Sequence, residues 1–377
     1  MLNNSLIDLQ YLFSFVTQKV NERKKSGQKL IDMGVGDVTL PLGEVMVSAG
    51  IDAISQLSCN EGFVGYGNCT GYDFLKDAII NYYADRVQLN RDEIFISDGA
   101  KSDCSATVDL FRGSVIIVDP VYPVYVNANK IQGNPIIYFE GNRQNGFKPK
   151  PDYNYIASAV YICSPSNPTG VVYTKAELYD WVNYCKKTGA ILIFDSAYES
   201  YIIENYPRSI FEIDGAEDVA IEINSFSKSA GFTGLRCGYT IIKNNTLKSM
   251  WKNRQSSKFN GASYPIQCMA AAAYSKEGKA EWQKNTSYYL ENSALLYRAI
   301  FRTGRYCTGG INSPYVWFDC GQNSLEFFDK LLDNGLVVTP GYGFGKSGQN
   351  FIRVTGFSSK ENTKAAIEIL KFALKNG

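Results

Sequence analysis

Residues 93–226 alternate short apolar runs with longer segments of helical character, and this alternation limits the fold more than any other feature. Six apolar runs each end in a polar turn: EIFISDGA (93–100), SVIIVDP (114–120), PIIYFEG (135–141), AVYICSPSNPTG (159–170), AILIFDSAY (190–198) and VAIEINSF (219–226). Nearly continuous apolar runs are typical of a mainly parallel sheet that helices cover on both faces. The pattern therefore predicts an α/β sandwich, whose ligands gather at the carboxyl ends of the strands.

One of the intervening helices is marked at both ends. Thr174 and Glu177 have the spacing of a capping box, and Gly189 provides a stop signal. The apolar residues between them share one helical face: Leu178, Trp181, Val182 and Cys185. A helix that crosses between two strands in this way is what the sandwich requires.

Beyond about residue 275 the pattern changes to long helices, Gly/Pro-rich turns and short strands. GGINSPYVWFD, LVVTPGYGFG and FIRVTGF predict strands of a smaller sheet, and KENTKAAIEILKFALKNG predicts a closing helix. We expect a helix near residues 7–25 and a strand in KLIDMGVGD to pack with this part. The predicted domains are a large one over 41–275 and a small α+β one formed by 1–40 plus 276–377.

The chain of 377 residues contains no histidine, which excludes Ser-His-Asp and Cys-His catalysis and histidine-based metal sites. No metal site is predicted. Acid–base work would fall to Lys, Asp, Glu, Tyr or Cys, or to a cofactor. With 38 basic and 37 acidic residues, the chain has no strong net field to attract nucleic acid or a membrane surface.

The nine cysteines are scattered and include no C-x-x-C, which fits reduced thiols in a cytoplasmic protein better than a disulfide framework. No apolar run is long enough to span a membrane, and MLNNSLIDLQ lacks the pattern of a signal peptide. We expect a cytoplasmic protein with no membrane partner.

The segment SFSKSAGFTGLRCG (225–238) follows the last apolar run and combines serines, a lysine and an arginine among glycines. Ser225 and Ser227 can donate to a phosphate, and Arg236 can bind it bidentately. Lys228, between them, is a candidate for the amine that forms a Schiff base with pyridoxal phosphate. A polar loop with a solvated lysine is the alternative, while the Walker pattern does not occur here.

Further candidates supply the other needs of pyridoxal chemistry. Asp195 could hold the pyridine nitrogen protonated, or it could cap a helix. Asn167 and Tyr198 could donate hydrogen bonds to the phenolic oxygen, although Asn167 before Pro168 also suits a plain turn. Tyr122 could cover the ring face or belong to the core.

The remaining needs concern two anions. Backbone N–H groups of Ala100 and Lys101 open a predicted helix and could bind the phosphate. Arg353, within the apolar run FIRVTGF, could bind a substrate α-carboxylate, and a buried charge there requires a partner. The order Asn, Asp, Lys, Arg along the chain makes the set specific.

These residues lie in motifs that resemble those of fold-type I pyridoxal-phosphate aminotransferases. SPSNPTG is similar to S-P-x-N-P-T-G, FDSAY to D-x-A-Y, and residues 225–238 to S-x-S-K-x-x-G-x-x-G-x-R-x-G. Within that superfamily the chain most resembles the LL-diaminopimelate aminotransferases, over nearly its whole length. The similar segments include GDVTLPL, VGYGNCTGY, IFISDGAKSD, DPVYPVYV, KFNGASYPIQ and VVTPGYGFGKSG.

The resemblance implies a seven-stranded large-domain sheet and a homodimer with shared active sites. It implies that Lys228 is the catalytic lysine, and that Tyr66 of the other subunit joins the phosphate site. The cofactor-binding set it implies is Tyr66, Ala100, Lys101, Tyr122, Asn167, Asp195, Tyr198, Ser225, Ser227, Lys228 and Arg236. The substrate-binding set it implies is Tyr11, Gly36, Cys69, Lys101, Tyr122, Asn167, Asn260 and Arg353.

One position departs from the family pattern. Where the family carries an acidic residue that can meet the distal ammonium of diaminopimelate, this chain has Cys69. The expected reaction converts tetrahydrodipicolinate and L-glutamate into LL-diaminopimelate and 2-oxoglutarate, a step toward lysine and peptidoglycan. Three alternatives stay open: an aminotransferase for another amino acid, another pyridoxal enzyme such as a C–S lyase or decarboxylase, and a non-catalytic ligand-binding protein on this fold.

Overall fold

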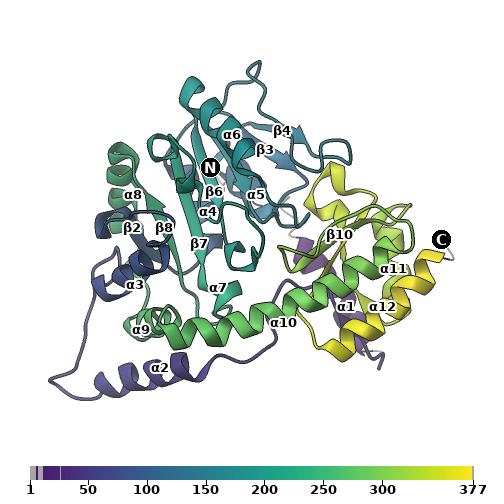
Figure 1. Ribbon diagram of the computed structural model, residues 1–377, viewed down its shortest axis with the longest axis horizontal. Coiled ribbons are helices and arrows are strands. Elements are labelled where there is room, and N and C mark those ends of the chain that lie inside the picture. Colours follow the sequence, from purple (N-terminus) through teal and green to yellow (C-terminus); the bar gives the residue numbers. More distant parts are fainter. Residues whose placement is uncertain (1–5, 7–11, 26, 376–377) are drawn as a thin grey trace.

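A seven-stranded sheet forms the centre of the protein in the computed structural model, which describes residues 6, 12–25 and 27–375 (Figure 1). Its strand order is β2-β8-β7-β6-β5-β3-β4. The strands are β2 (Ile94–Ser97), β3 (Val115–Asp119), β4 (Ile136–Glu140), β5 (Ala159–Cys163), β6 (Ile191–Asp195), β7 (Ala220–Ser225) and β8 (Gly238–Ile242). All six predicted strands are present. The sequence did not predict β8, which pairs antiparallel with both β2 and β7, whereas β3 to β7 pair in parallel.

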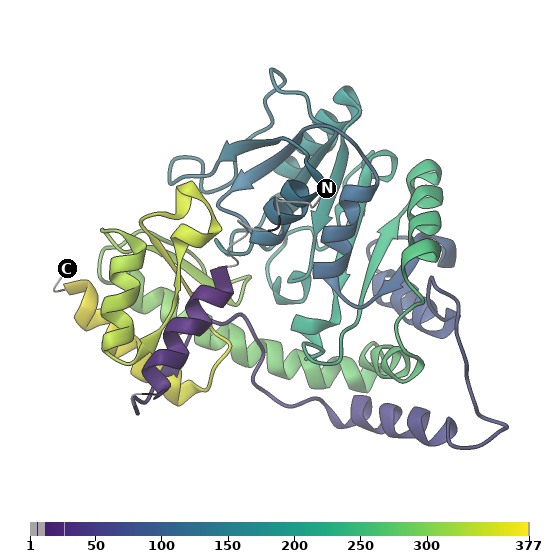
Figure 2. The same ribbon diagram turned by 180° about the vertical axis from the view of Figure 1, so that it is seen from behind.

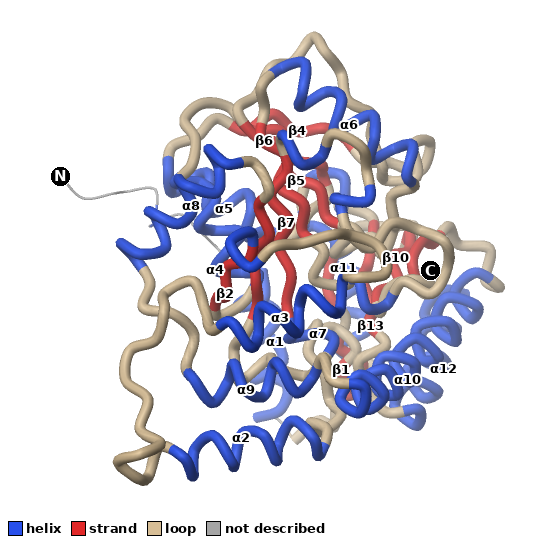
Figure 3. Tube along the Cα trace, turned by 60° about the vertical axis from the view of Figure 1, so that its left-hand side comes forward, coloured by secondary structure: helices blue, strands red, loops and turns tan. Residues whose placement is uncertain are grey.

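Helices cover both faces of this sheet, which explains why most of its strand residues are apolar (Figure 3). On β3, Ile116 and Val118 pack toward the cluster that includes Trp181, while Val115 and Ile117 pack toward the cluster that includes Trp251. The helices are α4 (Ala100–Ala106), α5 (Pro123–Gln132), α6 (Lys175–Thr188) and α8 (Asn245–Lys258). The α/β sandwich is therefore confirmed.

Helix α6 shows how the local sequence fixes an element. The backbone N–H of Glu177 donates to Thr174 Oγ1 at 3.2 Å, and the Glu177 carboxylate accepts from the N–H of Thr174 at 2.8 Å. Gly189 ends the helix in the left-handed region, with φ of 75°. The predicted capping box and stop are both confirmed.

A third layer of helices packs around β2 and β8 at one side of the sheet. It consists of α2 (Glu44–Gln56), α3 (Asp73–Tyr83) and α9 (Tyr264–Ala273), which share a buried cluster with Ile94, Ile96 and Tyr239. Helix α10 (Lys276–Phe301) then runs from this layer to the smaller sheet (Figure 1).

The smaller sheet has the order β12-β13-β10-β9 and lies beside the large one (Figure 2). Its strands are β9 (Cys307–Gly309), β10 (Tyr315–Asp319), β12 (Thr339–Pro340) and β13 (Phe351–Thr355), covered by α11 (Ser324–Asp333) and α12 (Lys360–Lys375). The N-terminal part packs beside this sheet: β1 (Ile31–Asp32) pairs in parallel with β11 (Leu336–Val337) in a separate two-stranded sheet, and α1 (Leu12–Lys25) contributes Val16 and Val20 to the core that both sheets share. The domain boundaries near residues 41 and 276 stay a prediction.

Short elements complete the described chain. They are α7 (Phe226–Ser229) and the 3-10 turns η2 (Arg91–Glu93), η3 (Thr107–Asp109), η4 (Glu199–Tyr201), η5 (Ile210–Glu212), η6 (Ala216–Asp218), η7 (Gly341–Phe344) and η8 (Lys346–Gly348). None of the described helices has both the length and the apolar character needed to cross a membrane.

Candidate active site

A cavity of ≈ 470 Å³ lies where the carboxyl ends of the large-sheet strands face the smaller sheet. Most of the predicted site residues line it: Gly36, Ala100, Lys101, Tyr122, Asn167, Asp195, Tyr198, Ser225, Ser227, Lys228, Arg236 and Arg353. The structure therefore brings together residues that are up to 317 positions apart, from Gly36 to Arg353. Their individual roles stay predictions.

Lys228 reaches the cavity from α7, a single helical turn that continues directly from β7. Its Nζ donates to the carbonyl oxygen of Gly36 and lies 5.7 Å from the ring centre of Phe357. Burial lowers the pKa of this amine to about 8; nearby Asp37 opposes the shift, while Arg353 and Arg236 add to it. About a tenth of the amine is therefore neutral, and so nucleophilic, at pH 7, far more than for an ordinary lysine.

Asp195 ends β6 and is buried. Its Oδ2 accepts from the Tyr125 hydroxyl at 2.5 Å and from Cys104 Sγ at 3.5 Å, and its Oδ1 accepts from the N–H of Ala197 at 3.0 Å. Burial raises the pKa of this carboxyl group, and the three donors oppose that shift. The predicted alternative, a helix cap, does not describe these contacts, because two of the three donors are side chains from α4 and α5.

One end of the cavity is built for an anion. Ser225 and Ser227 are buried, Ser227 Oγ accepts from Arg236 Nη1 at 3.3 Å, and the first N–H groups of α4 lack acceptors within the helix. Arg236 adopts φ of 64°, a backbone conformation that costs a non-glycine residue energy and that often marks a functional site. Gly99 permits this approach, since a Cβ there would lie 2.6 Å from Arg236 Nη2.

A second cationic group closes the opposite wall. Arg353 lies on β13 with 0% exposure, donates to Asn167 Oδ1 and to the Gly34 carbonyl oxygen at 2.7 Å each, and sits 4.4 Å from the Tyr315 ring centre. The acceptors of these hydrogen bonds are neutral, so a carboxylate entering the cavity would supply a charge that these acceptors do not. Asn167 turns its oxygen to Arg353, which leaves its amide donor for a ligand.

Tyr198, Tyr315 and Tyr122 line the cavity. The hydroxyl groups of Tyr198 and Tyr315 are 2.6 Å apart, and burial raises the pKa of both phenols. Tyr122 lies at the N-terminal end of α5 and contacts Tyr125 edge to face, with ring centres 5.8 Å apart. Neutral phenols of this kind can donate hydrogen bonds without adding charge.

Three of the described residues that were predicted for the site do not line the cavity. Tyr66 is 94% exposed, and Cys69 and Asn260 belong to two adjacent loops, because a Cβ on Gly261, the residue after Asn260, would lie 3.6 Å from Cys69 Cα. Tyr11 lies outside the described residues. Within one chain, therefore, Tyr66, Cys69 and Asn260 are not part of the cavity wall.

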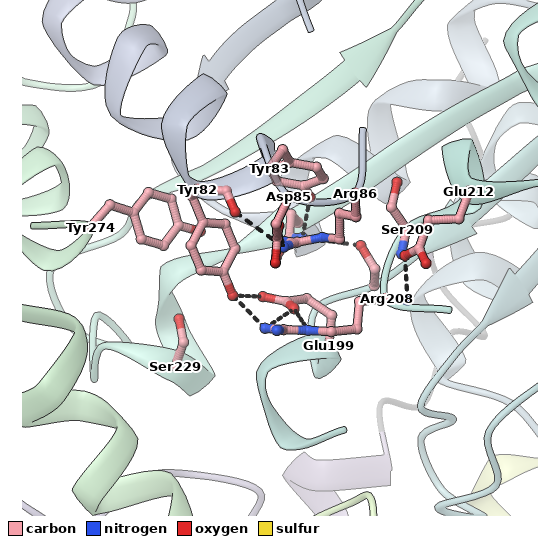
Figure 4. A network of polar contacts seen from close by, with 12 residues as sticks. Tyr82, Tyr83, Asp85, Arg86, Glu199, Arg208, Ser209, Glu212, Ser229 and Tyr274 are labelled. Carbon is pink, nitrogen blue, oxygen red and sulfur yellow. Dashed lines mark hydrogen bonds and ion pairs between the residues drawn. The ribbon is translucent and has the colours of Figure 1, made fainter. Parts of the chain in front are cut away.

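A buried polar network supports the segment that carries Tyr198 (Figure 4). Glu199, the next residue, accepts from Arg208 Nε at 2.8 Å and from the Tyr82 hydroxyl at 2.6 Å. Arg208 also donates to Tyr82, at 2.6 Å. The network ties the turn after β6 to α3, and it helps to hold Tyr198 at the cavity wall.

Sequence reasoning missed several residues that line the cavity or contact its lining. Tyr125 and Cys104 contact Asp195, Tyr315 contacts Tyr198, and Asp37 lines the cavity without a hydrogen bond or ion pair to another described residue. Tyr125 alone had a usable signal, because it follows Tyr122 by three positions on a helix that begins at Pro123. The others depend on contacts between distant elements.

The residues present fit pyridoxal phosphate, with an anion cup at one end, a carboxylate for a ring nitrogen and a lysine between them. A mainly parallel seven-stranded sheet with such a site at its carboxyl edge defines the class as a fold-type I transferase. The chain belongs to the aminotransferase class I and II family, whose model matches residues 28–370. The protein is accordingly a transaminase.

Individual relatives cover almost the whole chain. It is 44% identical to an LL-diaminopimelate aminotransferase of Lawsonia intracellularis, over 99% of this chain and 98% of that protein. Its fold matches the L,L-diaminopimelate aminotransferase of Chlamydomonas reinhardtii with a TM-score of 0.92 and 34% identity, covering 99% and 98% of the two chains. An aminotransferase from Mycobacterium tuberculosis, with 23% identity, a TM-score of 0.90 and 98% coverage of both chains, shares the fold.

Proposed function

We propose that the protein is a pyridoxal-phosphate-dependent LL-diaminopimelate aminotransferase. It would transfer the amino group of L-glutamate to tetrahydrodipicolinate, with uptake of water, and give LL-diaminopimelate and 2-oxoglutarate. The observation that carries this proposal is the 44% identity, over 99% of the chain, to an enzyme of that name. The cavity adds support from chemistry, since it offers a group for each part of the cofactor and for an α-carboxylate.

The cofactor would be held by residues from five strand ends of the large sheet, those of β2, β3, β5, β6 and β7. Ser225, Ser227, Arg236 and the backbone N–H groups of Ala100 and Lys101 would bind its phosphate. Asp195 would accept from the ring nitrogen, Asn167 and Tyr198 would donate to the ring oxygen, and Tyr122 would cover one ring face. When bound, the cofactor supplies an electron-accepting ring that stabilises negative charge at the substrate Cα.

The chain's own residues would then bind the substrate and move protons. Lys228 would hold the cofactor through its amine, at the cofactor's aldehyde carbon. Lys228 Nζ, with a pKa lowered to about 8, would take the proton from the substrate Cα and return it to the cofactor's C4′ carbon. Arg353 would bind the α-carboxylate, as its planar fork allows, and Gly36 and Lys101 would line the substrate side.

We also propose a homodimer in which each subunit completes the other's site. Tyr66 is 94% exposed and lies away from its own cavity, so its predicted contact with the phosphate requires a second copy. Cys69 and Asn260 lie on adjacent loops and would enter the partner's site together with it. All nine cysteines are free thiols, which supports the proposed cytoplasmic location.

The catalytic role of Lys228 can be tested with one variant. We expect Lys228→Ala protein to bind pyridoxal phosphate without a covalent linkage and to lose transamination by several orders of magnitude. Reduction with borohydride followed by peptide mass analysis should place the cofactor on Lys228 in the wild type. A Lys228→Ala protein that turns over at the wild-type rate would refute the proposal.

The substrate is tested by a panel of amino donors mixed with the cofactor-loaded protein. We expect LL-diaminopimelate and L-glutamate to convert the cofactor to its amine form, and 2-oxoglutarate to reverse the change. Cys69 favours a second candidate, an aminotransferase for a different amino acid, because a cysteine side chain lacks the carboxylate that would pair with a distal ammonium. If LL-diaminopimelate gives no conversion while another amino acid does, that second function replaces the first.

A further inference from the structure

We propose that Tyr125 is a positioning residue that holds both Asp195 and Tyr122 in place for the cofactor ring. The inference rests on the proposed cofactor, because Asp195 and Tyr122 are the groups assigned to the ring nitrogen and the ring face. Tyr125 itself does not need to touch the ring. It would link two separate ring contacts through one buried side chain.

Tyr125 contacts Asp195 through its hydroxyl group. Tyr125 is 1% exposed and donates its hydroxyl hydrogen to Asp195 Oδ2 at 2.5 Å. Cys104 Sγ donates to the same oxygen at 3.5 Å, while the N–H of Ala197 donates to Oδ1 at 3.0 Å. Donors on both oxygens fix the plane of the carboxylate, and Oδ1 keeps a lone pair for a donor in the cavity.

The surroundings of Asp195 make this hydrogen bond important. The titratable side chains that face it are Tyr125 from α5, Cys104 from α4 and Cys163 from β5, and burial raises the pKa of all three. All three are therefore neutral, and none can compensate a buried carboxylate by charge. The Tyr125 hydroxyl is the shortest donor to it and favours the ionised form that a protonated ring nitrogen requires.

The ring of Tyr125 packs against two other tyrosine rings. Tyr125 meets Tyr122 edge to face, with ring centres 5.8 Å apart and an angle of 87°. Its other neighbour is Tyr161 of β5, stacked at 5.2 Å and 21°, whose own hydroxyl group lies 2.9 Å from Thr107 Oγ1. Tyr125 therefore packs between β5 and the cavity wall. Its hydroxyl group donates to Asp195, while its ring contacts Tyr122 and Tyr161.

The test compares Tyr125→Phe with the matched variant Tyr161→Phe. Both remove one buried hydroxyl group from the same aromatic stack, but only the first removes a hydrogen bond to Asp195. Cofactor-free protein is titrated with pyridoxal phosphate, and the visible absorption of the bound cofactor is then followed against pH. We expect Tyr125→Phe to weaken binding on the order of tenfold to a hundredfold, while Tyr161→Phe changes it by less than about threefold.

The pH titration separates positioning from a general loss of packing. A less protonated ring nitrogen withdraws less electron density. The pH midpoint of the change in the visible absorption band should therefore move to higher pH in Tyr125→Phe, by on the order of one unit. Equal affinity and equal titration in wild type and Tyr125→Phe would overturn the inference, as would equal losses in both variants. If Tyr125→Phe fails to fold, fluorotyrosine incorporated at position 125, which changes the hydrogen-bond strength of the hydroxyl group at nearly constant size, decides, and an unchanged titration there overturns the inference.

Failure of this inference is distinguishable from failure of the proposed function. A wild-type protein that binds no pyridoxal phosphate refutes the function. A wild-type protein that binds it with the same affinity and titration as Tyr125→Phe refutes only the role of Tyr125.

Discussion

The Glu199–Arg208–Tyr82 network offers a sharp test of how the cavity wall is supported (Figure 4). Replacing Glu199 by Gln keeps the size of the side chain but removes the negative charge. Arg208 Nη2 lies 2.6 Å from Glu199 Oε2, and the Glu199 side chain is only 3% exposed. The change therefore leaves a guanidinium group that is 31% exposed without its anion.

The expected cost follows from breaking one side of a buried ion pair. Removing one partner of such a pair costs about 3–5 kcal/mol, and the partial exposure of Arg208 places the expected loss at about 3 kcal/mol. Arg208→Met should cost a similar amount, because it leaves the Glu199 carboxylate buried with Tyr82 as a neutral donor. The double variant should lose less than the sum, with a coupling energy of about 2 kcal/mol.

The assay is urea unfolding of the cofactor-free protein, followed by tryptophan fluorescence, for the wild type, both single variants and the double variant. An exposed pair on α12 gives the control: Lys371 and Glu368 are 2.8 Å apart with side chains 44% and 73% exposed, and Glu368→Gln should cost less than about 1 kcal/mol. Additive losses, or a Glu199→Gln cost as small as that of the control, would refute the reasoning.

Three further outcomes follow from the same geometry. The rate at which pyridoxal phosphate attaches to the cofactor-free protein should rise with pH, with a midpoint near the lowered Lys228 pKa of about 8. Because Asp37 raises that pKa, stopped-flow absorbance should show the midpoint at lower pH in Asp37→Asn. Burial raises the pKa of Asp103 to about 7, so between about pH 4 and 7 the folded state binds more protons than the unfolded state. The free energy of unfolding should therefore fall as pH rises through this range. Urea unfolding at pH 5 and at pH 7 should show that Asp103→Asn removes on the order of 2 kcal/mol of this fall. Gly99→Ala should weaken cofactor binding at least about tenfold in an equilibrium titration, since its Cβ would lie 2.6 Å from Arg236 Nη2; unchanged affinity would contradict the close approach.

The strands could be predicted from the sequence because burial on both faces leaves long apolar runs. The exception is β8, whose residues Gly238–Ile242 directly follow the glycine-rich segment of Lys228. Its start at a glycine is a packing requirement, since a Cβ on Gly238 would lie 2.7 Å from Gly99 Cα. Such a close approach between distant segments leaves no periodic signal, and the antiparallel pairing with β2 and β7 could not be predicted.

The same distinction holds in the cavity. Residues that follow strand ends, such as Asp195 and Lys228, could be proposed because the topology brings all carboxyl ends to one edge. Tyr315 could not, and Tyr125 had only its spacing from Tyr122 as a signal, because each gains its place from a contact across elements: Tyr125 with Asp195 of β6, and Tyr315 with Tyr198. A tyrosine on an apolar helix face or strand has the same local pattern whether it fills a core or orients a carboxylate.

The loop that carries Cys69 is held by hydrogen bonds in which Cys69 takes no part. It is anchored from within, because Asn68 Oδ1 accepts from Thr70 and the buried Lys76 donates to Thr70 Oγ1 at 2.9 Å. Cys69 contributes to neither of these contacts and does not line the chain's own cavity. Replacing an acidic residue by cysteine there leaves the core, Lys228 and the anion cup unchanged. In the proposed homodimer, a change at this one position would alter which distal group the partner's site accepts while the transamination chemistry stays the same.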